Sequence, residues 1–224
     1  MSLFALSDTH LSLSTDKPMD IFGSRWQQHD KRISEAWTET VGDGDTVVIA
    51  GDISWAMSMD DALTDLAYLD RLPGRKLIGR GNHDYWWGTV NKMKKFFVEQ
   101  HGLTTLEFLY NNAFEVGEFI VCGSRGWWGD EGLCPSGVDY GKIVAREALR
   151  VGLSLDAGER LRAAAHERGE ERELLVFLHF PPIFRDYRCE EIIEVLRQHG
   201  VKRCFYGHIH NSYDIPPAFE EGGI

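Results

Sequence analysis

Side chains that bind divalent metal ions recur in five short segments of the chain. Carboxylate oxygens, amide oxygens and imidazole nitrogens are the ligands that such ions prefer. A single histidine of this kind is more often structural, but five segments with the same chemistry favour one shared site. In extended chain, residues two apart point the same way, so Asp8 and His10 are expected to reach the same ion. The segments are Asp8-Thr9-His10, Gly51-Asp52, Gly81-Asn82-His83-Asp84, His179 and Gly207-His208-Ile209-His210.

Each of these segments follows a short apolar run that is predicted to be a buried strand. Amphipathic segments between the runs are predicted to be helices, and Ser58 is predicted to cap the helix that follows it. Alternating strands and helices indicate an α/β domain, with ligands at the carboxyl ends of its strands. The expected strands are 3–7, 46–50, 76–79, 119–122, 174–178 and 203–206, and the expected helices are 25–40, 59–72, 89–100 and 190–199. A hairpin with its turn at Asn111-Asn112 is expected within residues 106–122.

Taken in order, the motifs Asp-x-His, Gly-Asp, Gly-Asn-His-Asp, a lone His and Gly-His-x-His resemble the calcineurin-like metallophosphoesterase superfamily over residues 3–210. The resemblance implies an α/β fold, namely a four-layer α/β/β/α sandwich of two mixed sheets. It implies a single metallophosphoesterase domain over residues 1–224. The implied activity is hydrolysis of a phosphate ester at a dinuclear metal centre.

The resemblance also implies a role for each motif residue. His83 is expected to be a catalytic acid or a phosphate ligand, oriented by Asp84. One metal ion is expected on Asp8, His10, Asp52 and His210, with Asp52 bridging to a second ion on Asn82, His179 and His208.

Elementary chemistry supports a centre of this kind. Two cations about 3.5–4 Å apart stabilise the attacking and leaving oxygens of a displacement at phosphorus. Metal coordination lowers the pKa of water to about 7, so a metal-bridging hydroxide is the expected nucleophile. The neutral amide of Asn82 keeps the site from repelling phosphate, and His83 can protonate the leaving alkoxide, with Asp84 raising its pKa. Mn²⁺ is the expected metal, and Fe, Zn, Ni and Co are the alternatives.

Arginines and tryptophans close to the motifs are candidates for binding the substrate. Arginine suits bidentate phosphate contacts and tryptophan can stack on a planar group, although ion pairing and core packing are their more common roles. The candidates are Arg80, Arg125, Arg185, Trp55, Trp86 and Trp127, with Trp87 and Trp128 beside them. The glycine-rich segment 123–142 is a candidate substrate flap.

The net charge of −11 makes nucleic acid a poor partner, because phosphate backbones attract basic surfaces. The expected partner is a small phosphorylated substrate, with a nucleotide as one candidate. No run approaches the roughly 18 apolar residues of a spanning helix, and the N-terminus lacks a signal-peptide pattern, so no membrane partner and a cytoplasmic location are expected. The charged segment 156–173 is expected to be a solvated helix face. The remaining histidines, expected to face solvent, are His29, His101, His166 and His199.

The motifs leave the exact activity open. A phosphodiesterase or nucleotide pyrophosphohydrolase is the alternative to a monoesterase. The charge disfavours a nuclease, and the short chain offers little sequence for the peptide groove of a protein phosphatase. A non-catalytic scaffold on the same fold is an alternative of another class, which the intact ligand positions disfavour. Only fourteen residues, 211–224, follow the last motif, so a C-terminal strand is expected to be missing.

Overall fold

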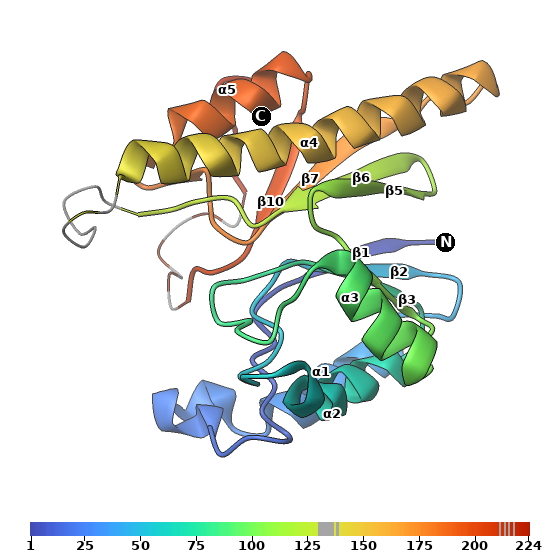
Figure 1. Ribbon diagram of the computed structural model, residues 1–224, viewed down its shortest axis with the longest axis vertical. Helices are drawn as coiled ribbons and strands as arrows, with labels where there is room; N and C mark the ends of the chain where they lie inside the picture. Colours follow the sequence, from blue (N-terminus) through green and yellow to red (C-terminus); the bar gives the residue numbers. More distant parts are fainter. Residues whose placement is uncertain (130–136, 138, 211, 213, 215, 217) are drawn as a thin grey trace. The chain divides into compact units, whose positions relative to one another are not determined.

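The computed structural model describes residues 1–129, 137, 139–210, 212, 214, 216 and 218–224 (Figure 1). The chain divides into two compact units, residues 1–108 and 109–224. Each unit is built on one four-stranded sheet, and a two-stranded sheet adds to the second unit. No helix in the described part of the chain is both long enough and apolar enough to cross a bilayer.

The sheet of the first unit is parallel throughout, in the order β1-β2-β3-β4. Its strands are β1 (Leu3–Leu6), β2 (Thr46–Ile49), β3 (Arg75–Ile78) and β4 (Leu106–Phe108). Figure 1 shows α1 (His29–Thr40) and α2 (Met59–Asp70) along one face of this sheet. The shorter elements are the 3-10 turns η1 (Met19–Phe22) and η2 (Ser24–Trp26), α3 (Val90–Met93) and the π-helical η3 (Lys94–Gln100). Ser58 caps α2 as predicted, because its side chain accepts the N–H of Asp61 at 3.2 Å.

The sheet of the second unit is mixed, in the order β10-β7-β6-β5. Its strands are β5 (Asn112–Val116), β6 (Phe119–Ser124), β7 (Glu173–Leu178) and β10 (Arg203–Tyr206), and β8 (Ile183–Phe184) pairs with β9 (Tyr187–Arg188). The long helix α4 (Tyr140–Glu167) packs on β5, β6 and β7 and against α5 (Glu190–Gln198). Gly158 permits this packing, because a Cβ there would overlap the sulfur of Cys122. Buried aliphatic side chains from α4, α5 and the sheet form the core of the unit.

The α/β class with two sheets and their helices is confirmed. The predicted hairpin is present as β5 and β6, but its turn lies at Gly117, where φ is +57°, rather than at Asn111-Asn112. Only the C-terminal part of α4 was expected, from the charged segment 156–173. The candidate flap 123–142 includes residues 130–136 and 138, which lie outside the described residues, as do 211, 213, 215 and 217 after β10.

Lys76 connects three elements of the first unit from inside its core. The side chain is fully buried on β3, and its Nζ donates to the carbonyl oxygens of Asp70, the last residue of α2, and of Leu72 just after it. It also donates to the Thr105 hydroxyl just before β4, at 3.1 Å. Burial lowers the pKa of Lys76 to about 8, because a buried ammonium loses its hydration.

We expect the burial of Lys76 to make the free energy of unfolding depend on pH. Between pH of about 8 and 10.5 the unfolded lysine still binds a proton that the folded protein has released, so stability must rise with pH. Relative to Lys76→Met, the free energy of unfolding of the wild type should increase by at most about 3 kcal/mol across that range. Urea unfolding of both proteins at a series of pH values measures the difference. Parallel pH profiles would contradict the lowered pKa.

Candidate metal centre

The predicted ligands of the first unit gather at one edge of its sheet. Asp8 and His10 follow β1, Asp52 follows β2, and Asn82 and His83 follow β3. Because these strands are parallel, their carboxyl ends meet at the same edge. The sheet therefore places the predicted metal ligands of the first unit at one edge, as expected for a ligand site.

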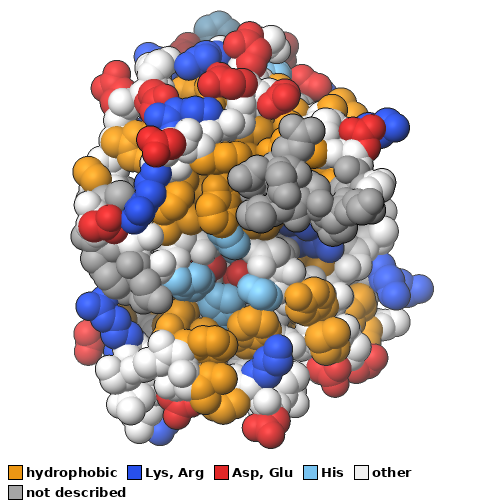
Figure 2. All heavy atoms as spheres, turned by 90° about the vertical axis from the view of Figure 1, so that its left-hand side faces the viewer, with side chains coloured by type: hydrophobic (Ala, Val, Ile, Leu, Met, Phe, Trp, Pro, Cys, Tyr) orange, Lys and Arg blue, Asp and Glu red, His pale blue; other side chains and the backbone are white. Residues whose placement is uncertain are grey.

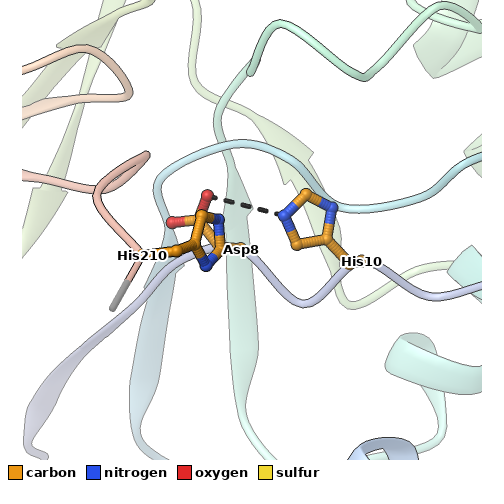
Figure 3. A group of neighbouring side chains, drawn as sticks. All are labelled: Asp8, His10 and His210. Carbon is orange, nitrogen blue, oxygen red and sulfur yellow. Dashed lines mark ion pairs between the residues drawn. The ribbon is translucent and has the colours of Figure 1, made fainter. Parts of the chain in front are cut away.

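The side chains of His10, Asp8 and Asp52 converge. His10 Nε2 lies 3.8 Å from Asp8 Oδ1 and 3.8 Å from Asp52 Oδ2, and Figure 3 marks the first of these distances with a dashed line. These separations are too long for hydrogen bonds. They fit ligand atoms that each lie about 2.1 Å from a common ion. With His10 and Asp52 at 3% and 1% exposed, the donor set and its burial both suit a divalent cation.

The second unit places its predicted ligands in the same way. His179 follows β7, and His208 and His210 follow β10, the parallel neighbour of β7. Ligand nitrogens of His179 and His208 lie within 4.8 Å of each other. The N–H of Gly207 donates to the carbonyl of His179 at 3.1 Å, which fixes one loop against the other.

Several candidate ligands have a strained backbone. Asp8, His10, Asp52 and His208 have positive φ values of 58°, 43°, 52° and 69°, and they are four of the seven non-glycine residues with positive φ in the described chain. The expectation that Asp8 and His10 share an ion because the chain is extended was therefore wrong in its reason, although the two side chains do meet. Left-handed residues cost about 1–2 kcal/mol each and cluster at functional sites.

Hydrogen bonds between loops hold this conformation in the first unit. The N–H of Asp8 donates to the carbonyl oxygen of Gly51 at 3.0 Å, and the N–H of His10 donates to the backbone carbonyl oxygen of Asp52 at 2.9 Å. His83 donates its N–H to Asp52 Oδ1 at 2.8 Å, while Asp52 Oδ2 faces His10. The hydrogen bond to Oδ1 thus orients the Asp52 carboxylate and leaves Oδ2 facing His10.

Asp84 was expected to orient the His83 ring, but it binds backbone N–H groups instead. Its carboxylate is 1% exposed and accepts the backbone N–H groups of the loops after β2 and β3. The donors are Gly81 at 2.7 Å, Asp52 and Ile53 at 2.9 Å, Ser54 at 3.3 Å, and the Trp86 indole at 3.1 Å. Burial raises the pKa of Asp84 to about 6, although these hydrogen bonds act in the opposite direction. Asp84 therefore joins the two loops that carry Asp52, Asn82 and His83.

The two loops also touch at a pair of glycines. A Cβ on Gly51, where φ is +94°, would lie 2.6 Å from the nitrogen of Gly81. A Cβ on Gly81 would overlap both the backbone nitrogen and Oδ1 of Asp52. Glycine is required at both positions because the backbones approach each other too closely for any side chain.

The tryptophans pack against the candidate ligands or inside the core. Trp55 stacks on His10 with ring centroids 5.2 Å apart and lies 4.4 Å from the ring of His83, and Trp128 lies 5.1 Å from the ring of His208. Figure 2 shows hydrophobic side chains beside histidines on the face that it draws. Trp86 is 3% exposed and bonded to Asp84, so the proposal that it stacks on substrate was wrong. Trp127 is half-buried and lies 5.9 Å from the Phe180 ring.

The candidate arginines Arg125 and Arg185 form ion pairs. Arg125 lies 3.5 Å from the buried carboxylate of Glu147, and Arg185 lies 2.9 Å from Asp214. Arg80 is half-buried two residues after β3. Substrate contacts by Arg125 and Arg185 would therefore compete with these partners inside the protein.

His29, expected to face solvent, instead supports the first motif. It is half-buried at the start of α1, with Nε2 3.1 Å from the carbonyl oxygen of Thr9 and 3.3 Å from that of His10. Its Nδ1 lies 3.2 Å from the carbonyl oxygen of Trp26, whose ring meets the edge of His10 at 5.7 Å. Neither His29 nor Trp26 belongs to a recognisable motif, so only the tertiary structure reveals their contacts with His10.

We expect Gly81→Ala to displace Asp52 and thereby weaken metal binding. The added methyl group overlaps a backbone atom, so the loop itself must move. Mn²⁺ binding should weaken by about tenfold or more, as measured by titration of the metal-depleted protein. Gly44→Ala is the matched control, because open space surrounds its Cβ. Unchanged binding by Gly81→Ala would contradict the position given to Asp52.

Comparison with known proteins identifies a family over most of the chain. The model of the calcineurin-like phosphoesterase family matches residues 1–212. The Gene 66 protein of Mycobacterium phage L5 is 41% identical over 58 residues, so the matched part spans 26% of this chain and about 28% of the length of this curated relative.

Two solved structures resemble the chain at low sequence identity. The structure of Phosphopantetheinyl Hydrolase (PptH) from Mycobacterium tuberculosis has a TM-score of 0.50 and 16% identity, covering 99% of this chain and 86% of that chain. The protein of unknown function AQ665 from Aquifex aeolicus has a TM-score of 0.42 and 18% identity, covering 92% of this chain and 89% of that chain. The first likeness supports the fold alone. The chain belongs to the calcineurin-like phosphoesterase family.

Proposed function

We propose that this chain is a metal-dependent phosphoesterase that works as one catalytic domain with two divalent ions. The observation that carries the proposal is the convergence of His10 with two carboxylates, Asp8 and Asp52, at the carboxyl edge of a parallel sheet. Family membership supports phosphate ester hydrolysis as the activity.

We assign Asp8, His10, Asp52 and His210 to one ion, and Asp52, Asn82, His179 and His208 to the other. Carboxylate, amide and imidazole donors of this mixture suit Mn²⁺, and Fe, Zn, Ni and Co are alternatives. When bound, the ions activate water as the nucleophile and offset the charge on the phosphoryl oxygens.

His83 is the proposed general acid. Its backbone is fixed by the bond to Asp52, and its ring packs on Trp55 beside the ring of His10. These contacts hold the imidazole next to the ligand set, where it can donate a proton to the leaving oxygen. Asp84 contributes by accepting backbone N–H groups of the loops after β2 and β3 rather than by a hydrogen bond to the His83 ring.

The proposed substrate is a small organic phosphate, with a nucleotide as one candidate. A hollow of about 790 Å³ in the first unit includes Trp26 and His29 in its lining, and both contact His10. Its volume lies within the range of small-molecule sites. Aromatic, amide and carboxylate side chains line it, which suits a hydrogen-bonding organic group. Monoester and diester hydrolysis, and the cytoplasmic location, stay predictions.

Metal removal tests the proposed function directly. Chelation should abolish hydrolysis of p-nitrophenyl phosphate, bis-p-nitrophenyl phosphate or a nucleotide, and Mn²⁺ should restore it at two ions per chain. Asp52→Asn should lose both ions, since the shared carboxylate is replaced by an amide, whereas Asp16→Asn, at an exposed loop carboxylate, should behave as wild type. Full turnover by protein shown to be metal-free by elemental analysis would overturn the proposal.

His83→Gln should keep both ions but slow the chemical step. A general acid contributes about 10²–10⁴-fold, mostly for leaving groups that need a proton. We therefore expect kcat to fall much more for alkyl phosphates than for p-nitrophenyl phosphate. His101→Gln, at an exposed histidine, is the control. An equal loss for good and poor leaving groups would argue against proton donation by His83.

A further inference from the structure

Glu147 is a fully buried carboxylate of the second unit with no place in the proposed chemistry. It lies on α4, and its Oε1 faces three guanidinium groups: Arg150 at 2.6 Å, Arg146 at 3.4 Å and Arg125 at 3.5 Å. A buried charge is costly unless it is paired, so at least one of these contacts has to be maintained in the folded protein. Arg146 and Arg150 belong to the same helix as Glu147, whereas Arg125 comes from the loop after β6.

Arg125 connects the carboxylate to the candidate metal ligands. Its side chain is 16% exposed, and its guanidinium lies 5.7 Å from the centre of the Trp127 ring and 5.8 Å from that of Phe180. Its backbone carbonyl accepts the N–H of His179 at 3.1 Å and the N–H of Phe180 at 2.9 Å. The guanidinium and the carbonyl of one residue thus join Glu147 to the backbone of His179.

This series of contacts from Glu147 continues from His179 to His208, the next candidate ligand. The carbonyl of His179 accepts the N–H of Gly207 at 3.1 Å, and Gly207 directly precedes His208. The loop after β6 also packs tightly on this region, because a Cβ on Gly126 would lie 3.0 Å from the carbonyl oxygen of Phe180. A change in the position of Arg125 would therefore move the loops of both His179 and His208.

We infer that Glu147 is a positioning residue for the metal centre, which fixes the His179 and His208 loops through Arg125. The inference rests on the proposed function, because it takes these two histidines to be metal ligands. It also gives Arg125 a role in the fold in place of the expected phosphate contact. Groups that orient a metal ligand typically change metal affinity by about 10–100-fold when they are replaced.

Mn²⁺ titration of the metal-depleted full chain tests the inference, with free Mn²⁺ followed by its electron paramagnetic resonance signal. Glu147→Gln should weaken one of the two Mn²⁺ sites about tenfold or more and leave the other unchanged. Arg125→Gln should do the same without altering α4, which keeps the test valid if Glu147→Gln fails to fold. The double variant should bind no more weakly than the weaker single variant.

Two variants on α4 serve as matched controls. Arg150→Gln removes the shortest contact of Glu147 but does not touch the path to His179, and Glu159→Gln removes a carboxylate that pairs with Arg162. Both should bind two Mn²⁺ ions as the wild type does, whatever their melting temperatures. Wild-type binding by Arg125→Gln, or an equal loss in Arg150→Gln, would overturn the inference. Fewer than two Mn²⁺ ions on the wild type would overturn the proposed function instead.

Discussion

The carboxylate of Asp84 lies where the loops after β2 and β3 meet, and it accepts N–H groups from both of them. These loops carry Asp52, Asn82 and His83, so a single buried acceptor determines how three candidate site residues approach each other. A buried carboxylate is stable only while such donors surround it. The same contact brings Gly51 against Gly81 and leaves no space for a Cβ at either position. The candidate metal centre of the first unit therefore depends on a buried carboxylate that is not itself one of the proposed ligands.

The candidate ligands could be selected from the sequence because metal chemistry restricts residue type strongly and because parallel strands bring their carboxyl ends together. The α/β class followed from the same alternation of apolar runs and amphipathic segments. Ser58 could be predicted as a cap because its interaction with Asp61 is local in the chain. The hairpin turn could not be placed, because the Asn111-Asn112 signal is local while strand register is set by pairing across β5 and β6.

Other parts of the site depend on contacts between distant residues. A carboxylate next to a histidine resembles an orienting pair, and only the position of residues 52–54 shows that Asp84 binds backbone amides instead. Trp55 and Trp86 both follow a motif, yet one packs on His10 and the other is buried beside Asp84. The support of His10 by His29, and of His179 by Arg125, joins residues that no sequence spacing relates.

We propose that the carboxylate of Asp52 binds two metal ions. Anomalous diffraction from crystals grown with Mn²⁺ tests it most directly. We predict two Mn²⁺ peaks about 3.5–4 Å apart, both within about 2.2 Å of an Asp52 oxygen, with His10 on one ion and His179 on the other. A single peak, or two peaks of which only one contacts Asp52, would contradict the account.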